Sequence, residues 1–155
     1  MAYNQNRYFI YTLSVWQLVL NLAIFGVVAG QLTNTGGYVC IMWEDTSNSG
    51  LCNLSYIVAG ISIAFLGIIS FFQYKYYLYS PAIQSIFLCL LACLYLLAGS
   101  LTTLGSVFSA DVLGIEGQYW RTVVYGLFWT QFSTCFIMVG STAFFANTDM
   151  GHLPY

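Results

Sequence analysis

Four long stretches of the chain contain no Asp, Glu, Lys, Arg or His, and they limit the possible folds more than any other feature. They are residues 9–30, 54–74, 82–104 and 122–146. Each has about 20 residues or more, enough for an α-helix to cross a hydrocarbon core roughly 30 Å thick. A long buried helix of a soluble protein would keep a polar stripe, whereas these stretches carry only scattered Ser, Thr, Gln and Asn. The pattern predicts four transmembrane helices.

The composition and the short connections indicate one membrane domain. Only 5% of the 155 residues are charged, whereas a soluble protein has about a quarter. The second and third stretches are joined by residues 75–81 alone, and Pro81 is expected to begin the third helix, a position that proline prefers. Short connections force neighbouring helices to run antiparallel. We therefore predict an all-α fold, an integral membrane antiparallel four-helix bundle over residues 1–155.

The charged residues are expected to lie only in termini and loops, leaving the bundle interior without an ionisable group. Arg7 and Lys75 fall on the side of the termini, against Arg121 on the other side. By the positive-inside rule, this bias predicts cytosolic termini in a multi-pass protein, without identifying the organelle. The eight charged residues are Arg7, Glu44, Asp45, Lys75, Asp111, Glu116, Arg121 and Asp149.

The cysteines divide into two groups. Cys40 and Cys52 share the first long loop, which the predicted orientation places on the lumenal or extracellular side. Disulfides persist there, so we predict a Cys40–Cys52 bridge, with two unpaired thiols as the alternative. Cys89, Cys93 and Cys135 lie in the middle of helices and are expected to be small apolar packing residues.

The predicted helices lack the groups that many membrane functions need. Pumps, proton relays and coupled transporters use ionisable side chains within the membrane. Haem and metal sites need several His or Cys ligands, but the one histidine is His152, near the C-terminus. We therefore predict no catalytic residue, no cofactor, no metal and no enzymatic activity.

Small residues recur at a spacing of seven, which is close to two helical turns and places each set on one helix face. Such faces let another helix approach closely. Packing within the bundle is the simpler expectation, and contact with another copy or a partner is the alternative. The residues are Gly60 and Gly67, Ala92 and Gly99, and Gly126, Ser133 and Gly140, and the first helix adds Gly26 and Gly30, a pair of small residues four apart.

Four amide side chains fall within the predicted helices. Gln17 and Asn21 are four residues apart and share one face of the first helix, while Gln84 and Gln131 belong to the third and fourth. An amide in hydrocarbon needs a hydrogen-bond partner, so we expect these side chains to link helices. A contact with a lipid headgroup or sterol, or an amide oxygen bound to a pigment magnesium, remains open.

The segment Leu94-Tyr-Leu-Leu-Ala-Gly-Ser-Leu-Thr-Thr-Leu-Gly105 combines aromatic and small residues in the third stretch. With the four short-looped helices, it resembles the third helix of MARVEL-type tetraspans, the group of physins, occludin-like proteins and myelin-and-lymphocyte proteolipids. The resemblance implies membrane organisation, such as vesicle biogenesis, domain scaffolding or junction roles, without catalysis. Claudins are a second resemblance. The chain departs from them because Trp43 lies between Cys40 and Cys52 and the loop is short.

These observations favour a scaffold over the other classes of membrane protein. We expect a non-enzymatic tetraspan that organises membrane domains through lateral contacts with the lipid bilayer, other membrane proteins or copies of itself, and no nucleic-acid partner. The alternative is a small accessory subunit of a large respiratory, rotary or photosynthetic complex. A pore formed by oligomerisation is a third hypothesis, although no charged ring is visible.

Overall fold

The computed structural model describes four helical ranges of the chain, residues 2–32, 50–74, 81–109 and 118–150. Every residue in these ranges is helical, which confirms the predicted all-α class. Proline begins the third helix, as expected. The elements are α1 (Ala2–Val27), which continues into the π-helical segment η1 (Val28–Leu32), α2 (Gly50–Tyr74), α3 (Pro81–Ser109) and α4 (Gln118–Met150).

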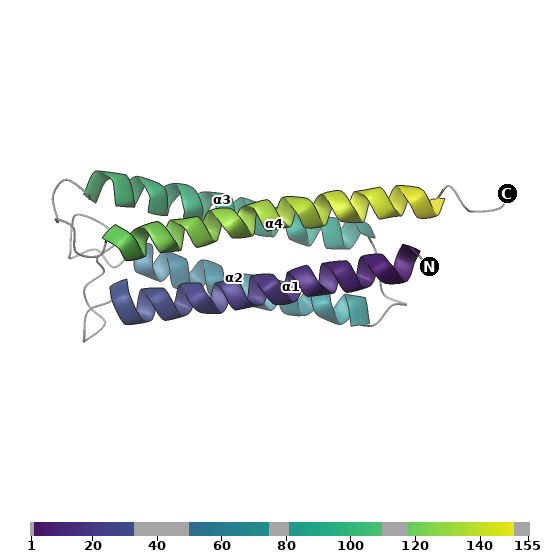
Figure 1. The fold of residues 1–155 in the computed structure, drawn as a ribbon, viewed down its shortest axis with the longest axis horizontal. Coiled ribbons are helices and arrows are strands. Elements are labelled where there is room, and N and C mark those ends of the chain that lie inside the picture. Colours follow the sequence, from purple (N-terminus) through teal and green to yellow (C-terminus); the bar gives the residue numbers. More distant parts are fainter. Residues whose placement is uncertain (1, 33–49, 75–80, 110–117, 151–155) are drawn as a thin grey trace.

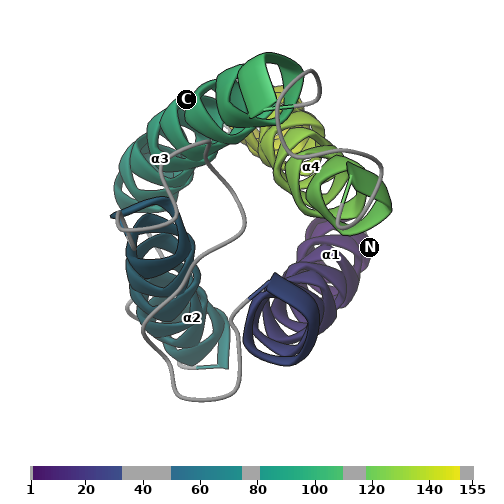
Figure 2. The ribbon, with the colours of Figure 1, turned by 90° about the vertical axis from the view of Figure 1, so that its left-hand side faces the viewer.

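The four helices run antiparallel to their neighbours along one common axis, with the start of α1 and the end of α4 at the same end (Figure 1). Viewed along that axis, they form a ring in the order α1, α2, α3, α4 (Figure 2). Each helix contacts the next, and α4 closes the ring on α1. Among the described residues, the diagonal pairs α1/α3 and α2/α4 have no close backbone contact. The interior must therefore be filled by side chains.

All four helices are long and apolar enough to cross a membrane, judged by length and composition. The apolar segments have 22 to 26 residues, or about 33–39 Å of helix. Their outer faces carry large apolar side chains, including Leu22, Ile57, Ile86 and Phe136. Such a surface is costly in water and favourable in lipid. The apolar segments are Tyr8–Leu32, Gly50–Phe71, Ala82–Val107 and Tyr119–Phe144.

All four helices extend beyond the predicted ranges, and α1 already begins at Ala2. α2 begins at Gly50, α3 continues to Ser109 through Gly105, and α4 begins at Gln118. Polar residues and glycine served as end signals in the sequence. Near a membrane they end helices less reliably, because little water competes there for the backbone hydrogen bonds.

Hydroxyl side chains occur along all four helices without breaking them. Many of them donate to the backbone carbonyl four residues earlier, at 2.6–3.0 Å. This bond satisfies the hydroxyl within its own helix, so that the residue can face lipid or core. The donors include Ser14, Ser55, Ser62, Thr102, Thr130, Ser133, Thr134, Ser141 and Thr142.

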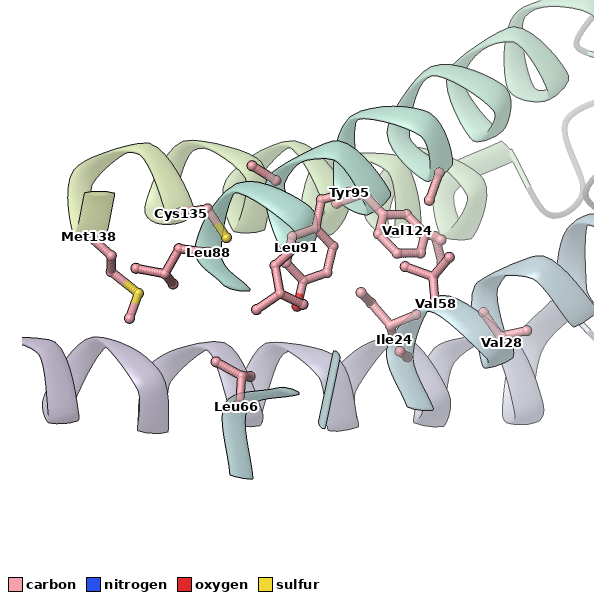
Figure 3. Close-up of a cluster of buried hydrophobic side chains, with 14 of the residues drawn as sticks. Ile24, Val28, Val58, Leu66, Leu88, Leu91, Tyr95, Val124, Cys135 and Met138 are labelled. Carbon is pink, nitrogen blue, oxygen red and sulfur yellow. The ribbon is translucent and has the colours of Figure 1, made fainter. Parts of the chain in front are cut away.

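Aliphatic and aromatic side chains from all four helices fill the interior (Figure 3). Aromatic rings also pack against each other between neighbouring helices. Phe25 of α1 stacks on Tyr56 of α2 with ring centroids 5.5 Å apart, and Phe65 of α2 meets the edge of Phe87 on α3 at 5.4 Å. The residues labelled in Figure 3 are Ile24, Val28, Val58, Leu66, Leu88, Leu91, Tyr95, Val124, Cys135 and Met138.

Candidate functional site

The two amides predicted to share a face of α1 both point into the bundle. Gln17 and Asn21 are fully buried. Gln17 Nε2 donates to the backbone oxygen of Gln131 on α4 at 3.3 Å and to the sulfur of Cys135 at 3.1 Å. Asn21 Nδ2 lies 3.0 Å from the Gln17 backbone oxygen and 3.4 Å from Gln131 Oε1. These contacts join α1 to α4, as interhelical hydrogen bonds were expected to do.

Tyr95 of α3 forms the centre of the same group. Its side chain is fully buried, and its hydroxyl accepts a hydrogen bond from Asn21 Nδ2 at 3.0 Å. The side chain of Ser62 on α2 makes a second polar contact with Tyr95, and the Tyr95 ring packs on Phe128 of α4 with centroids 6.5 Å apart. All four helices thus contribute to one polar cluster. It consists of Gln17, Asn21, Ser62, Tyr95, Gln131 and Cys135.

The polar cluster lies at the middle of the apolar segments. Asn21, Ser62, Tyr95 and Gln131 each fall within about two residues of the centre of their segment. Hydrogen bonds at this depth face no competition from water, and a polar group without a partner there is costly. The sequence contained one signal for Tyr95, because tyrosine in membrane helices favours the interfaces and this one lies at the centre.

The polar cluster keeps some hydrogen-bonding capacity. Gln17 Oε1, Asn21 Oδ1 and Gln131 Nε2 are buried and have no hydrogen-bond partner within the described ranges. A water molecule can donate to both oxygens and accept from the amide nitrogen, whereas a ligand hydroxyl can donate to one oxygen and accept from the nitrogen. The described members of the cluster are amides, hydroxyls and a thiol, so the arrangement can bind and position a small polar group.

Gln84, the fourth predicted amide, lies apart from this cluster. Its Nε2 donates to the Thr142 hydroxyl at 3.3 Å, which links α3 to α4 toward the end where α4 finishes. Three of the four predicted amides therefore meet, and the fourth forms a separate α3–α4 link.

The small-residue faces divide into one that packs inside the bundle, Ala92 and Gly99 on α3, and others that have no close neighbour there. A Cβ added at most of the described helix glycines would meet no other atom within 4 Å. Gly99 is the exception, because a Cβ there would lie 3.5 Å from Phe128 and Trp129 of α4. The other glycines are exposed or partly exposed, so their faces point away from the interior. The open positions are Gly26, Gly30, Gly60, Gly67, Gly126 and Gly140, and Ser133 is exposed on the α4 face.

The mid-helix cysteines do not share one role. Cys135 is buried in the polar cluster, whereas Cys89 and Cys93 are exposed, which corrects the expectation that all three pack in the core. The two exposed thiols line an apolar cleft of about 220 Å³ on the outer side of α3 and α4, with Phe132 and Phe136 opposite. Cys135 differs because it accepts the hydrogen bond from Gln17.

The predicted disulfide falls partly beyond the described residues. Cys52 is buried near the start of α2, 1% exposed, and is not among the described free thiols. Cys40 lies outside the described residues. The Cys40–Cys52 bridge therefore stays a prediction.

The expectation that every charge lies in a terminus or loop is wrong for Arg121. This residue belongs to α4, and its side chain is 1% exposed. Its burial follows from the earlier start of α4, which places Arg121 on the same face as buried Val124 and Phe128. Arg7 and Asp149 also fall within helices, near the ends of α1 and α4.

Comparison with known proteins gives no relative. No family model matches the chain, and no curated protein or solved structure is similar to it. The resemblance to MARVEL-type tetraspans, with claudins second, therefore remains an expectation from the sequence.

Proposed function

We propose that the protein is a non-enzymatic tetraspan that organises membrane domains through lateral contacts with lipids and other membrane proteins, including copies of itself. The observation that carries the proposal is the outward direction of the small-residue faces. In lipid, apolar packing alone gives little drive for association, and helices associate where small residues let their backbones approach. Glycines that the fold does not use internally are therefore available for contacts between molecules.

Two of these faces have neighbours that suit close helix contact. On α2, exposed Ala64 lies between Gly60 and Gly67. On α4, the exposed hydroxyls of Thr130 and Ser133 donate to carbonyls of their own helix. Both faces therefore consist of small side chains, and the hydroxyl protons of Thr130 and Ser133 are already used in hydrogen bonds, so a neighbouring helix can approach closely.

The apolar cleft between α3 and α4 supports lipid contact. It has the thiols of Cys89 and Cys93 at one wall and aromatic rings at the other. Its lining is free of charged side chains, which fits an acyl chain better than a polar ligand.

The oligomeric part of the proposal is tested by filling one glycine face at a time. The variants Gly60→Leu/Gly67→Leu and Gly126→Leu/Gly140→Leu are purified in mild detergent and compared by blue-native electrophoresis. We expect the unmodified protein to migrate well above a monomer and at least one variant to lose that species. Monomer stability should change little, because these positions have space for a side chain. Ile68→Leu, at an exposed position on α2, is the matched control.

A strictly monomeric unmodified protein would contradict self-association. If all variants retain the large species, its contacts do not use the glycine faces and the structural argument fails.

The alternative, a small accessory subunit of a larger membrane complex, uses the same outward faces. It requires larger polypeptides at fixed stoichiometry in a native purification read by mass spectrometry. Recovery of the protein with only lipids and copies of itself would remove this alternative.

The topology belongs to the same proposal. With α1 beginning and α4 ending at one end of the bundle (Figure 1), we propose that this end faces the cytosol and that the Cys40–Cys52 bridge forms on the lumenal or extracellular side. A maleimide-polyethylene glycol gel shift should add more labels after reduction than before it. The Cys52→Ser variant should expose one extra thiol without reduction, and equal labelling under both conditions would contradict the bridge.

A further inference from the structure

Among the described residues, Arg121 is one of the largest side chains that the bundle buries. It is 1% exposed and lies on the inward face of α4, one turn before Val124 and two before Phe128, both 0% exposed. Its Nε, Nη1 and Nη2 atoms have no hydrogen-bond partner among the residues that the structure describes. An unpaired buried guanidinium is strongly unfavourable, because water is removed from five N–H donors and nothing replaces it.

The position of Arg121 adds a second attraction for an anion. α4 begins at Gln118, so Arg121 lies in the first turns, where backbone N–H groups lack helical partners and the helix dipole is positive. Side chains in a helix lean toward its N-terminus, which directs the guanidinium to these groups.

The neighbouring aromatics place this end of α4 at the level of lipid headgroups. Tyr119 is 69% exposed and meets the edge of Trp120, with ring centroids 5.1 Å apart. Exposed Tyr and Trp at the end of an apolar segment mark the membrane interface, where headgroup phosphates lie. Arg121, one residue further, lies just inside that level.

We propose that Arg121 and the N-terminus of α4 form a binding site for a phosphate oxyanion at this end of the bundle. The planar guanidinium binds two oxygens of a phosphate at once, and the free N–H groups of α4 complete the site. The phosphate comes from a phospholipid headgroup or from free phosphate, since both offer the same oxygens. This site goes beyond the proposed scaffold and stands independently of it.

The experiment uses the full chain, purified in an uncharged detergent and stripped of lipid. Binding of phosphatidylglycerol is measured by native mass spectrometry, and binding of inorganic phosphate by the shift of the thermal unfolding midpoint, with chloride as the salt control. We expect Arg121→Gln to weaken binding by roughly tenfold or more, since charge-assisted hydrogen bonds are the strong ones. Arg7→Gln, which removes the same charge from the opposite end, should bind like the unmodified protein.

Two further variants keep the test decisive if Arg121→Gln folds poorly. Arg121→Lys retains the charge without the two-pronged geometry and should bind with intermediate strength. Arg121→Met should unfold at a higher temperature than the unmodified protein when phosphate and lipid are absent, and should lose that advantage when either is added. Binding of lipid alone identifies the headgroup as the source, and saturable protection by inorganic phosphate identifies the free anion.

The acidic residues of the connecting segments provide the competing explanation. Glu44, Asp45, Asp111 and Glu116 lie in the segments that join helices at this end, outside the described residues. Equal binding of both probes by the unmodified protein and Arg121→Gln would overturn the proposal. A second result would also overturn it. If Arg121→Gln shifts the unfolding midpoint in the natural chain but not in a chain whose four acids are replaced by amides, Arg121 forms an ion pair with a carboxylate of its own chain.

Discussion

Removing the hydroxyl of Tyr95 should weaken the bundle by about 1 kcal/mol. Tyr95→Phe keeps the buried ring and its contact with Phe128 and deletes only the hydrogen bond with Asn21 and the polar contact with Ser62. Interhelical hydrogen bonds in membrane proteins are worth about 0.6 kcal/mol on average, so the bond and the additional contact together give about 1 kcal/mol. Asn21 Nδ2 keeps two other acceptors and Ser62 still donates to Val58. No donor is stranded, and the cost stays near this sum.

The assay is equilibrium unfolding in mixed micelles of dodecylmaltoside and dodecyl sulfate, followed by circular dichroism. A double-mutant cycle with Asn21→Ala isolates the Asn21–Tyr95 bond, and its coupling energy should be about 0.6 kcal/mol and at most about 1.7 kcal/mol. Tyr56→Phe is the matched control, because Tyr56 stacks on Phe25 and no described hydrogen bond uses its hydroxyl. Its free energy of unfolding should change by less than about 0.5 kcal/mol.

Equal effects of Tyr95→Phe and Tyr56→Phe, together with a coupling energy near zero, would refute the reasoning. The 3.0 Å contact between Asn21 and Tyr95 would then add nothing to stability, and the polar cluster would not be what holds the four helices together.

Three further predictions follow from the packing. Gly99→Leu should destabilise the bundle by about 1–3 kcal/mol, because a Cβ there already lies 3.5 Å from α4 side chains. Gly60→Leu, at an open position, should be tolerated, and equal unfolding curves for the two variants would contradict the prediction. A membrane-permeable maleimide should label exposed Cys93 in the folded protein and buried Cys135 only after unfolding, and equal rates would contradict the assigned faces. Gln84→Leu should cost about 0.6 kcal/mol, the worth of its single hydrogen bond to α4, and a loss above about 2 kcal/mol would indicate contacts beyond that bond.

The number of helices and the amide face of α1 could be predicted because each depends on short-range pattern. Uncharged stretches long enough to span lipid indicate helices, and a separation of four residues places Gln17 and Asn21 on one face. Which helix supplies their partners depends on the order of helices around the ring. The sequence alone does not fix that order, so the meeting of Asn21 with Tyr95 and Gln131 came only from the structure.

The direction of the small-residue faces could not be predicted for a related reason. Periodicity shows that Gly60 and Gly67 share a face, but in lipid both the inside and the outside of a bundle are apolar. The prediction for Arg121 is wrong because a charged residue beside an apolar stretch was taken to lie in a loop. A long side chain in the first turns of a helix can instead enter the end of the bundle.

The separation in sequence between the partners of the polar cluster affects how the protein is made. Asn21 and Gln17 bond to Gln131, which follows them by 110 and 114 residues. At about 5–20 residues per second, a ribosome needs roughly 5–20 s to produce that partner. During this delay α1 carries two amides whose interhelical partners, on α3 and α4, have not yet been made. The newly made first helix must therefore stay beside the insertion machinery or another polar surface until synthesis is nearly complete.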